Sequence, residues 1–405
     1  MPRVARSGAS PARASGIPRR RRSCSARRCD LNGRRITAAV LRQSGDQPRP
    51  YAQNAPLELA ELDLAGPGPG ELLVRIDAAG VCHSDLSVVN GDRPRPMPMA
   101  LGHEAAATVI ATGTPDDPGF APGDRVVLVF LPACGECALC RDGRGYLCEV
   151  AAAANGRGEL IGGGGRLSEG HAPVHHHLGV SAFASHAVVD RRSAVKVPSD
   201  IPAEIAALFG CAVLTGVGAV LNTAALREGE SVLVYGLGGV GMAALMGALA
   251  GGASRVTAID PSPEKRGLAL ELGAAAAVSP EEADSLDTAD VVIETVGRAS
   301  VLADACTRAR RGGRIVTVGL PHPSEKLVIP ALSLVAEGKA LIGSYMGSSI
   351  PARDIPRYIA LWREGRLPVE RLLTSVAPLS EINRCMDRLA DGQAIRQVVI
   401  PGGTE

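Results

Sequence analysis

The feature that most constrains the fold is a strand, a glycine turn and a helix in direct succession. Residues 231–235 form a β-branched apolar run that predicts a buried strand. The sequence Gly-Leu-Gly-Gly-Val-Gly follows at 236–241 and opens a helix rich in Ala, Leu and Met. This order is the context in which a Gly-x-Gly-x-x-Gly pattern binds a dinucleotide. Gly236 permits the tight turn, Gly238 lets the backbone approach a pyrophosphate, and Gly241 lets helix and strand pack closely.

An acidic residue after the next strand indicates which dinucleotide is bound. Asp260 stands nineteen residues beyond Gly241, at the end of a predicted strand. A carboxylate at this place hydrogen-bonds a ribose 2′-hydroxyl and repels a 2′-phosphate, so the sequence predicts NAD rather than NADP. The alternative is an ordinary glycine-rich turn with a helix-capping Asp260, which explains the strand, the glycines and the acid less well together.

The chain changes character after about residue 212. Before that point, from residue 36 onward, short strands end at Gly/Pro turns, which predicts an all-β, barrel-like half. After it, strands alternate with helices, which predicts a parallel sheet. The predicted strands are 72–76, 106–110, 125–130, 231–235, 255–259, 291–294, 314–318 and 397–400, and the predicted helices after the glycine turn are 261–272, 299–308, 355–364 and 380–389.

Composition and charge exclude several classes of partner. The chain has 405 residues, enough for two or three domains, of which 46% are apolar and 21% charged, as in globular proteins. Its net charge of +1 predicts neither a nucleic-acid partner nor an anionic membrane partner. The uncharged segment 231–254 contains seven glycines, so it predicts a strand, turn and helix rather than a membrane span.

The first 35 residues contain eleven arginines and one acidic residue, so they cannot bury enough apolar area to fold. We expect a disordered extension there. A transit peptide and a nucleic-acid-binding arm are the alternatives that this composition leaves open. Cys24 and Cys29 belong to the extension and are assigned no role.

Four cysteines within fifteen residues predict a structural metal site. They are Cys134, Cys137, Cys140 and Cys148. Four thiolates on one loop close a tetrahedral shell around zinc and leave no open position, so this zinc holds the shape of the loop. Disulfides and an iron–sulfur cluster are the alternatives. Zinc-binding thiols favour a reducing compartment, and we therefore expect a cytoplasmic protein.

A second set of predicted zinc ligands is dispersed in the sequence and would leave one position of the metal open. Cys82, His103 and Cys211 offer two thiolates and an imidazole, and three protein ligands leave the fourth zinc position open for water or substrate. Zinc at such a site lowers the pKa of an alcohol so that an alkoxide forms, and hydride passes to nicotinamide. Asp85 or Glu104 can orient His103. Taken alone, Cys211 in its apolar run reads as a core residue.

These motifs stand in the order found in the zinc-dependent medium-chain alcohol dehydrogenases, which the sequence resembles across residues 36–401. The matching segments are residues 80–85, 102–104, the four-cysteine lobe, 210–216, the glycine turn, 259–260 with Lys265, and 394–399. The resemblance implies an α/β protein with a GroES-like, β-barrel-type catalytic domain at 36–212 and 346–405. It implies a structural zinc lobe at about 132–150 and a Rossmann NAD-binding domain at 213–345, with the active site between the domains.

The resemblance also implies roles for individual residues. Ser84 would hydrogen-bond the alcohol and start a proton relay. The implied cofactor contacts are His83, Thr215, Gly236, Gly238, Gly239, Val240, Gly241, Asp260, Lys265 and Arg396. Of these, His83, Lys265 and Arg396 would contact phosphates or the adenosine ribose, and Thr215 and Val240 the nicotinamide. The implied substrate pocket contains Phe130, Tyr345 and Met346.

The implied activity is the interconversion of primary alcohols, aryl alcohols included, and aldehydes, by hydride transfer from a zinc-bound alkoxide to NAD. Two alternatives stay open. One is an S-(hydroxymethyl)glutathione, or formaldehyde, dehydrogenase. The other is a nucleotide-binding relative without catalysis, since a fold does not guarantee chemistry.

Two departures from the family pattern bear on these alternatives. Dimeric animal members carry a histidine at the outer end of the relay, where this chain has Ser87. Members that oxidise the glutathione adduct of formaldehyde carry an arginine just past the lobe, where this chain reads Glu-Val-Ala-Ala-Ala-Ala from Glu149. The relay therefore ends differently here, and the glutathione hypothesis is disfavoured.

Residues 149–185 resemble the longer loop of the family's dimeric branch and so predict a homodimer. The tract His175–His177 lies in this segment. We expect the tract to be a solvated loop rather than a metal site, because its spacing is not that of a built site.

Overall fold

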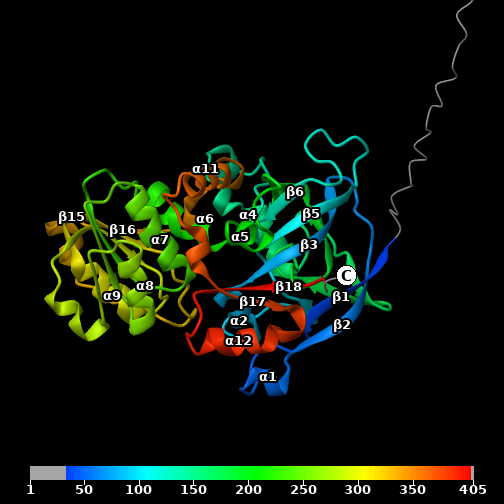
Figure 1. The fold of residues 1–405 in the computed structure, drawn as a ribbon, viewed down its shortest axis with the longest axis horizontal. Coiled ribbons are helices and arrows are strands. Elements are labelled where there is room, and N and C mark those ends of the chain that lie inside the picture. Colours follow the sequence, from blue (N-terminus) through cyan, green and yellow to red (C-terminus); the bar gives the residue numbers. More distant parts are fainter. Residues whose placement is uncertain (1–32, 403–405) are drawn as a thin grey trace, which may run out of the picture. The chain divides into compact units, whose positions relative to one another are not determined.

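The computed structural model describes residues 33–402 (Figure 1). The predicted disordered extension, with Cys24 and Cys29, lies outside the described residues except at its end. There the first strand, β1 (Arg34–Leu41), begins two residues earlier than predicted. It does so because Arg34 and Arg35 pair in register with β2 (Leu57–Leu64), and the Arg35 guanidinium lies 3.5 Å from Asp63.

The strand-rich half contains a small closed barrel and a larger sheet. The barrel order is β1, β2, β7 (Leu167–Glu169), β8 (Ala172–His176) and β4 (Met99–Ala100). The sheet order is β10 (Ala194–Lys196), β6 (Arg125–Leu128), β5 (Ala105–Thr112), β3 (Glu71–Val81), β18 (Arg396–Ile400) and β17 (Leu373–Pro378), with β9 (His186–Asp190) also on β3.

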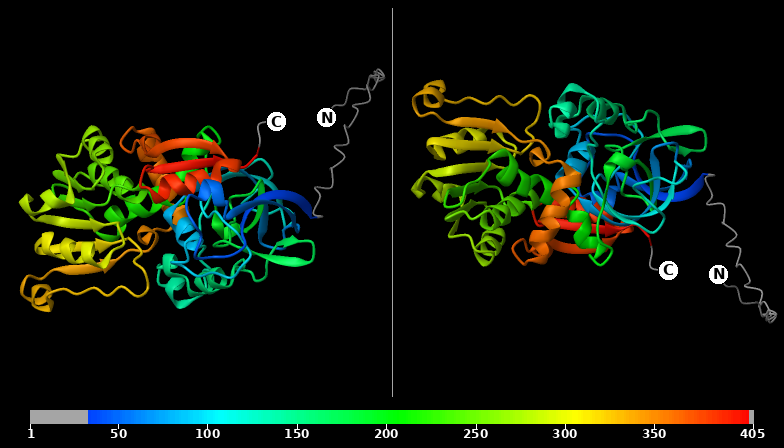
Figure 2. Two further views of the ribbon diagram at one scale, coloured as in Figure 1. Left: turned by 90° about the horizontal axis from the view of Figure 1, so that it is seen from below. Right: turned by 90° about the horizontal axis from the view of Figure 1, so that it is seen from above.

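The pairing of β18 with β3 joins distant parts of the chain. The two strands lie side by side (Figure 1, Figure 2). They are antiparallel, and Gln397 is opposite Val81. β3 ends where the Cys82 segment begins, and β18 begins at Arg396. The pairing therefore brings a predicted cofactor residue beside a predicted zinc ligand.

The second half forms one parallel sheet of six strands. Its order is β13 (Ala276–Val278), β12 (Arg255–Ile259), β11 (Ser231–Tyr235), β14 (Ala289–Glu294), β15 (Ala309–Thr317) and β16 (Ala340–Gly343). Alternate residues of β11 pack into two different cores, since Val232 and Val234 lie in one and Leu233 and Tyr235 in the other. Both faces of the sheet are therefore covered, as in doubly wound folds.

This strand order is that of a Rossmann fold, whose ligands bind where the order reverses. Here the reversal falls at β11, and the glycine turn follows that strand directly. The predicted parallel sheet and the predicted β-rich half are both confirmed.

The helices are mostly short. They are α1 (Tyr51–Asn54), α2 (His83–Val89), α3 (Ala138–Arg141), α4 (Glu149–Arg157), α5 (Ala203–Leu208), α6 (Ala212–Gly218), α7 (Gly239–Ala250), α8 (Pro263–Glu271), α9 (Ala299–Arg308), α10 (Ala331–Ala336), α11 (Pro351–Arg363) and α12 (Ile382–Ala390). Between residues 33 and 402, none combines the length and the hydropathy that a membrane span requires.

The segment read as a long loop is partly regular. Residues 149–185 contain α4 and the hairpin β7–β8, in which Leu167 pairs with Val174. This hairpin closes the barrel between β2 and β4. The segment is thus built into the barrel rather than projecting from it.

Candidate active site

The glycine turn is shaped by close backbone contacts. Gly236 has a φ of +84°, which favours glycine. A Cβ on Gly241 would come within 1.8 Å of the Gly236 carbonyl oxygen, so only glycine lets α7 pack this close to β11. The start of α7, a helix of 12 residues, offers free N–H groups of the kind that bind phosphate.

Asp260 is fixed at the end of β12. Its Oδ2 accepts a hydrogen bond from the backbone N–H of Leu237 at 2.6 Å, and its Oδ1 accepts one from Ser262 at 2.8 Å. The side chain is buried. The carboxylate thus ties the glycine turn to the next strand, and each of its oxygens keeps a lone pair for a further donor.

Arg396 and Glu104 form a buried ion pair beside this turn. Arg396 Nη1 lies 3.2 Å from Glu104 Oε1 and 3.3 Å from the Val81 carbonyl oxygen, to which it also donates. A Cβ on Gly239 would meet Arg396 Nε at 2.1 Å, so the arginine packs directly on the glycine turn. Burial raises the pKa of Glu104 to about 7, and the positive charge of Arg396 opposes that rise.

The dispersed ligand set converges in space. The donor atoms of Cys82, His103 and Cys211 all lie within 4.8 Å of one another, and all three side chains are buried. Cys82 precedes α2, His103 stands between β4 and β5, and Cys211 precedes α6. The hydrogen bond with the Cys211 thiol lowers the pKa of Cys82, which favours the thiolate that a metal needs.

Asp85 is hydrogen-bonded to Cys82 and His103 of this ligand set. Its Oδ2 accepts from the Cys82 N–H at 3.1 Å, and its Oδ1 from the Gly102 N–H at 3.3 Å. Oδ1 also lies 3.0 Å from His103 Nδ1, which leaves Nε2 of that ring for a metal. Burial opposes ionisation of Asp85, but the adjacent His103 overcomes this and holds the pKa of Asp85 at about 2. Of the two carboxylates expected to orient His103, Asp85 contacts it and Glu104 pairs with Arg396 instead.

The prediction that the histidine tract forms a solvated loop is wrong for His176 and His177. His175 and His176 lie on the barrel strand β8, and His176 and His177 are 0% and 1% exposed. His177 Nδ1 lies 3.1 Å from Asp85 Oδ1, and its ring meets the His103 ring edge-on with centroids 5.4 Å apart. The tract is buried because the barrel hairpin carries it against the ligand set.

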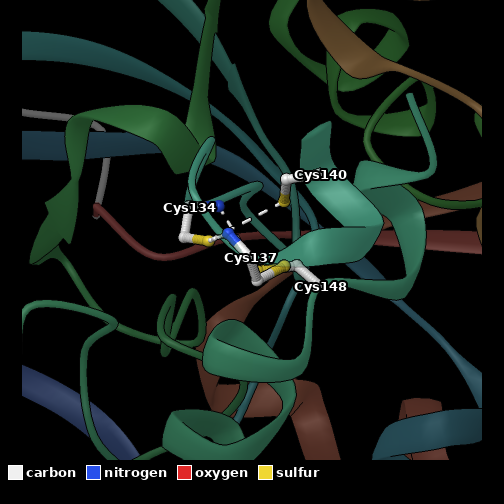
Figure 3. A group of neighbouring side chains, drawn as sticks. All are labelled: Cys134, Cys137, Cys140 and Cys148. Atoms are coloured by element: carbon white, nitrogen blue, oxygen red, sulfur yellow. Dashed lines mark hydrogen bonds between the residues drawn. The ribbon is translucent and has the colours of Figure 1, made fainter. Parts of the chain in front are cut away.

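The four-cysteine lobe is equally compact (Figure 3). The sulfur atoms of Cys134, Cys137, Cys140 and Cys148 lie within 4.8 Å of one another. Backbone N–H groups of Cys137 and Glu136 donate to Cys134 Sγ at 3.2 and 3.3 Å and lower the pKa of Cys134 to about 6. None of the eight described cysteines forms a disulfide, which leaves all four sulfurs available.

Both sets fit zinc by the chemistry of their donors. Thiolate sulfur and imidazole nitrogen are the donors that zinc prefers, and four thiolates make a closed structural shell. The set of Cys82, His103 and Cys211 supplies three donors and leaves one position open. The glycine turn, with a cationic side chain packed on it, fits a dinucleotide pyrophosphate.

One cleft, of about 390 Å³, connects the ligand set with the glycine turn. It is lined by these predicted site residues: Cys82, His83, Ser84, His103, Phe130, Cys211, Thr215, Gly238, Gly239, Val240, Gly241, Lys265, Tyr345, Met346 and Arg396. The other four residues predicted for catalysis or cofactor binding do not line the cleft but lie behind the residues that do. They are Asp85, Glu104, Gly236 and Asp260.

Contacts between helices bring together the two residues predicted to contact the nicotinamide. A Cβ on Gly216 would come within 2.2 Å of the Val240 carbonyl oxygen, so α6 crosses α7 at very short range. Thr215 of α6 and Val240 of α7 thereby meet at the cleft.

Two serines of α2 differ in the contacts that their hydroxyl groups make. The hydroxyl of Ser84 lies 3.9 Å from Cys82 Sγ, on the cleft side. Ser87 also lines the cleft, but its hydroxyl donates to the His83 carbonyl oxygen at 2.9 Å. The Ser87 proton is therefore engaged within the helix.

Sequence reasoning missed several lining residues, among them Arg93, Leu178 and Leu320. Arg93 follows the Cys82 motif closely, but it stands in a segment without regular periodicity, so nothing local shows where its side chain points. Leu178 adjoins the misread histidine tract. Only the fold brings these segments to the cleft.

Comparisons with known proteins agree with this arrangement. Residues 68–199 match the family model described as alcohol dehydrogenase GroES-like domain, and residues 239–364 match zinc-binding dehydrogenase. The chain is 34% identical to S-(hydroxymethyl)glutathione dehydrogenase of Escherichia coli over 361 residues, which cover 86% of this chain and 97% of the relative.

Solved structures are similar over most of their length. A zinc-binding-domain alcohol dehydrogenase protein from Burkholderia ambifaria is 34% identical with a TM-score of 0.85, covering 92% of this chain and 100% of its own. Benzyl alcohol dehydrogenase from Acinetobacter calcoaceticus is 27% identical with a TM-score of 0.83, covering 91% and 100%. The chain belongs to the zinc-dependent medium-chain alcohol dehydrogenase family and is an NAD-dependent oxidoreductase with zinc and NAD as cofactors.

Proposed function

We propose that this enzyme interconverts primary alcohols, including aryl alcohols, and the corresponding aldehydes. The observation that carries the proposal is the single cleft onto which Cys82, His103, Cys211 and the glycine turn all open. Bound zinc lowers the pKa of an alcohol, and NAD accepts a hydride. The similarity to a benzyl alcohol dehydrogenase supports the aryl alcohols in particular.

The roles of the protein's own residues follow from their contacts. Ser84 holds the alcohol proton at its hydroxyl and passes it outward. Asp85 keeps a proton on His103 Nδ1, so that Nε2 stays a ligand. The Ser87 hydroxyl donates within α2, so its oxygen can only accept, and we propose that cleft water carries the proton onward.

The cofactor contacts divide by chemistry. His83, Lys265 and Arg396 provide cationic or hydrogen-bonding groups at the cleft for the phosphates and adenosine ribose. Asp260 takes the ribose hydroxyls, while Thr215 and Val240 pack against the nicotinamide. Phe130, Tyr345 and Met346 form the walls around the substrate.

Similarity to a known protein supports a second candidate function. The 34% identical Escherichia coli protein is an S-(hydroxymethyl)glutathione dehydrogenase, so the glutathione adduct of formaldehyde is the rival substrate. Against it stands the segment after the lobe, where α4 begins at Glu149 and buries Ala151 and Ala154. No arginine occupies the place where members with that activity hold a carboxylate.

We propose further that the enzyme is a cytoplasmic homodimer. Val328, Leu332 and Val335 are 81%, 75% and 83% exposed in the segment that leads into β16, the edge strand of the parallel sheet. An exposed apolar group beside an open sheet edge is typical of an interface. Unpaired cysteines support a reducing compartment. The domain limits we propose are 36–212 with 346–405, and 213–345.

The decisive experiment is a panel of alcohols with NAD, followed by the absorbance of NADH. We expect turnover of primary and benzylic alcohols, and a rate with formaldehyde that does not depend on glutathione. A strong increase on adding glutathione would favour the rival substrate. Protein that holds two zinc ions and produces NADH from none of these alcohols would overturn the proposal.

A further inference from the structure

We propose that the outer part of the substrate pocket binds an anionic group of the alcohol, held by Arg93 and Arg95. The inference rests on the proposed alcohol dehydrogenase function and defines its substrate class. That class has the reacting hydroxyl at one end, an apolar or aromatic body, and a carboxylate at the other end. Neither the family motifs nor the predicted pocket residues include these two arginines.

A line of aromatic contacts leads outward from the zinc ligands to the arginines. The His103 ring meets Phe130 edge-on with centroids 5.7 Å apart, and Phe130 meets Tyr345 in the same way at 5.9 Å. Arg93 lines the same cleft as Tyr345. Arg95 is tied to Phe130 through Asn155, whose carbonyl oxygen accepts from Arg95 and whose Nδ2 donates to the Phe130 carbonyl oxygen at 2.8 Å. An alcohol held at His103 would therefore extend along two aromatic rings toward two cations.

Neither arginine has a counter-ion of its own. Arg93 lines the cleft, and its Nη2 donates to the Pro321 carbonyl oxygen at 3.2 Å. Arg95 donates from Nη1 to the Asn155 carbonyl oxygen at 3.3 Å, and its Nε is enclosed without a hydrogen-bond partner. Across residues 33–402 neither forms an ion pair, which distinguishes them from Arg396 with its Glu104.

Among the described residues, the cleft is lined by cationic side chains without acidic ones. No aspartate or glutamate lines it within the described part of the chain. A partly buried guanidinium without an anion is costly, and burial accordingly lowers the pKa of Arg95. A carboxylate on the substrate would supply the missing charge and the acceptors for the free N–H groups, a geometry that guanidinium groups match well.

The cofactor does not account for these two cations. The side chain expected at its phosphates, Arg396, packs on Gly239 of the glycine turn. Arg93 instead lines the cleft with Tyr345. Arg95 is tied through Asn155 to Phe130, a predicted residue of the substrate pocket. Pro94 and Pro96 flank Arg95 and fix the local backbone. The pair is therefore preorganised for a ligand group beyond Tyr345.

Two sources share this chemistry. One is an aryl or alkyl alcohol that carries a single carboxylate, and the other is the glutathione adduct of formaldehyde, which carries carboxylates on a peptide. We favour the first, because the aromatic walls between His103 and the arginines suit an apolar body. The experiment separates the two sources.

The test compares 4-(hydroxymethyl)benzoate with 4-(hydroxymethyl)benzamide, which has the same shape and no charge, using the holoenzyme. ω-Hydroxy acids of increasing length and S-(hydroxymethyl)glutathione form two further arms. We expect the wild type to prefer the benzoate in kcat/KM by about tenfold, and high salt to reduce this preference. Arg93→Gln and Arg95→Gln should reduce it toward unity through KM of the benzoate, with the benzamide unaffected.

Matched variants separate charge from folding. Arg93→Lys keeps the charge and should retain most of the preference, while Arg357→Gln removes an exposed arginine of α11 and should change nothing. Arg93 contributes a single hydrogen bond to the protein, so Arg93→Gln remains informative if Arg95→Gln fails to fold. Benzoate and benzamide binding to the enzyme–NAD complex, measured by calorimetry, requires no turnover.

The outcomes are distinct. Equal kcat/KM for benzoate and benzamide, or an equal loss on both in Arg93→Gln, overturns the anion site while leaving alcohol oxidation intact. An Arg93-dependent preference confined to S-(hydroxymethyl)glutathione overturns the assignment to single-carboxylate alcohols. An enzyme that oxidises no alcohol fails the proposed function, and the calorimetric preference for benzoate then decides the anion site alone.

Discussion

Arg396 donates to Glu104 across 3.2 Å, and this buried pair joins the glycine turn to the segment that carries His103, a predicted zinc ligand. The two side chains are 4% and 0% exposed. Arg396 packs on Gly239, and Glu104 fits against Gly80, where a Cβ would come within 2.6 Å of the carboxylate. The pair therefore fixes the position of the cofactor turn relative to the ligand set.

Breaking this ion pair should lower the free energy of unfolding. Arg396→Met leaves Glu104 buried without a partner, so we expect a loss of about 3 kcal/mol or more in unfolding free energy. The double variant Arg396→Met with Glu104→Gln should recover part of that loss. Urea unfolding measures both. Arg371→Met is the control, since its pair with Glu271 is 44% and 65% exposed and should be worth under about 1 kcal/mol. Equal losses of unfolding free energy in Arg396→Met and Arg371→Met would show that burial does not make the first ion pair more important than the second.

Asp85→Asn should weaken zinc binding without unfolding the chain. The amide cannot hold a proton on His103 Nδ1 as the carboxylate does, so we expect zinc affinity and kcat to fall by about 10- to 100-fold. Metal titration and steady-state rates measure the two effects. Asp92→Asn, an exposed change in the neighbouring loop, should leave both unchanged. Full zinc affinity in Asp85→Asn would show that the carboxylate does not position the ligand.

Ser84→Ala should lower kcat by about 10²-fold with KM for NAD unchanged, because only the group that holds the alcohol proton is lost. Ser84→Thr keeps the hydroxyl and is the control. Stopped-flow measurement of NADH formation checks the prediction. If alanine and threonine behave alike, the proton leaves by another route.

Cys134→Ser should remove one of two zinc ions and lower the melting temperature, while the donors at Cys82, His103 and Cys211 stay intact. Metal analysis by mass spectrometry and calorimetric melting provide the two readouts. Cys385→Ala, a change at a buried cysteine outside both ligand sets, should keep two zinc ions per chain. Loss of both ions from Cys134→Ser would mean that the two sites are not independent.

Acid should destabilise the protein through His176. Burial lowers the pKa of His176 to about 4, and its Nε2 accepts a hydrogen bond from the Arg166 N–H, so the ring is neutral when folded. The unfolded ring protonates near pH 6.5. The unfolded state therefore binds more protons below that pH, and stability falls between about pH 6.5 and 4, by on the order of 3 kcal/mol.

Urea unfolding as a function of pH tests this. His176→Gln should flatten the loss between pH 6.5 and 4, whereas His171→Gln, at an exposed position, should not. An unchanged pH profile in His176→Gln would assign the acid sensitivity to other groups.

Features encoded locally could be predicted from the sequence. The glycine turn, Asp260 and the four-cysteine lobe depend on spacing within one short segment, so their geometry follows from the residues themselves. Cys211 lies far from Cys82 in sequence, so donor chemistry alone suggested the set and the family resemblance then supported it. The residue that orients His103 stayed open between two carboxylates, because neighbours in sequence point in different directions.

The failures have a common physical cause. His177 was expected in solvent because the spacing of the histidine tract is not that of a built metal site, yet the barrel hairpin carries it against Asp85. Arg93 was missed because its segment is irregular, and its position depends on the loop that follows α2. Both errors arise where tertiary packing, rather than local pattern, decides the direction of a side chain.

The pairing of β18 with β3 also has a consequence for biosynthesis. Arg396 donates to the carbonyl of Val81, a residue 315 positions earlier. During synthesis the predicted thiol and imidazole ligands leave the ribosome long before Arg396 does. The catalytic sheet stays open on one side until the strand from Arg396 to Ile400 is available. Nascent chains should therefore remain inactive, and dependent on protection of that open edge, until almost the whole polypeptide has been translated.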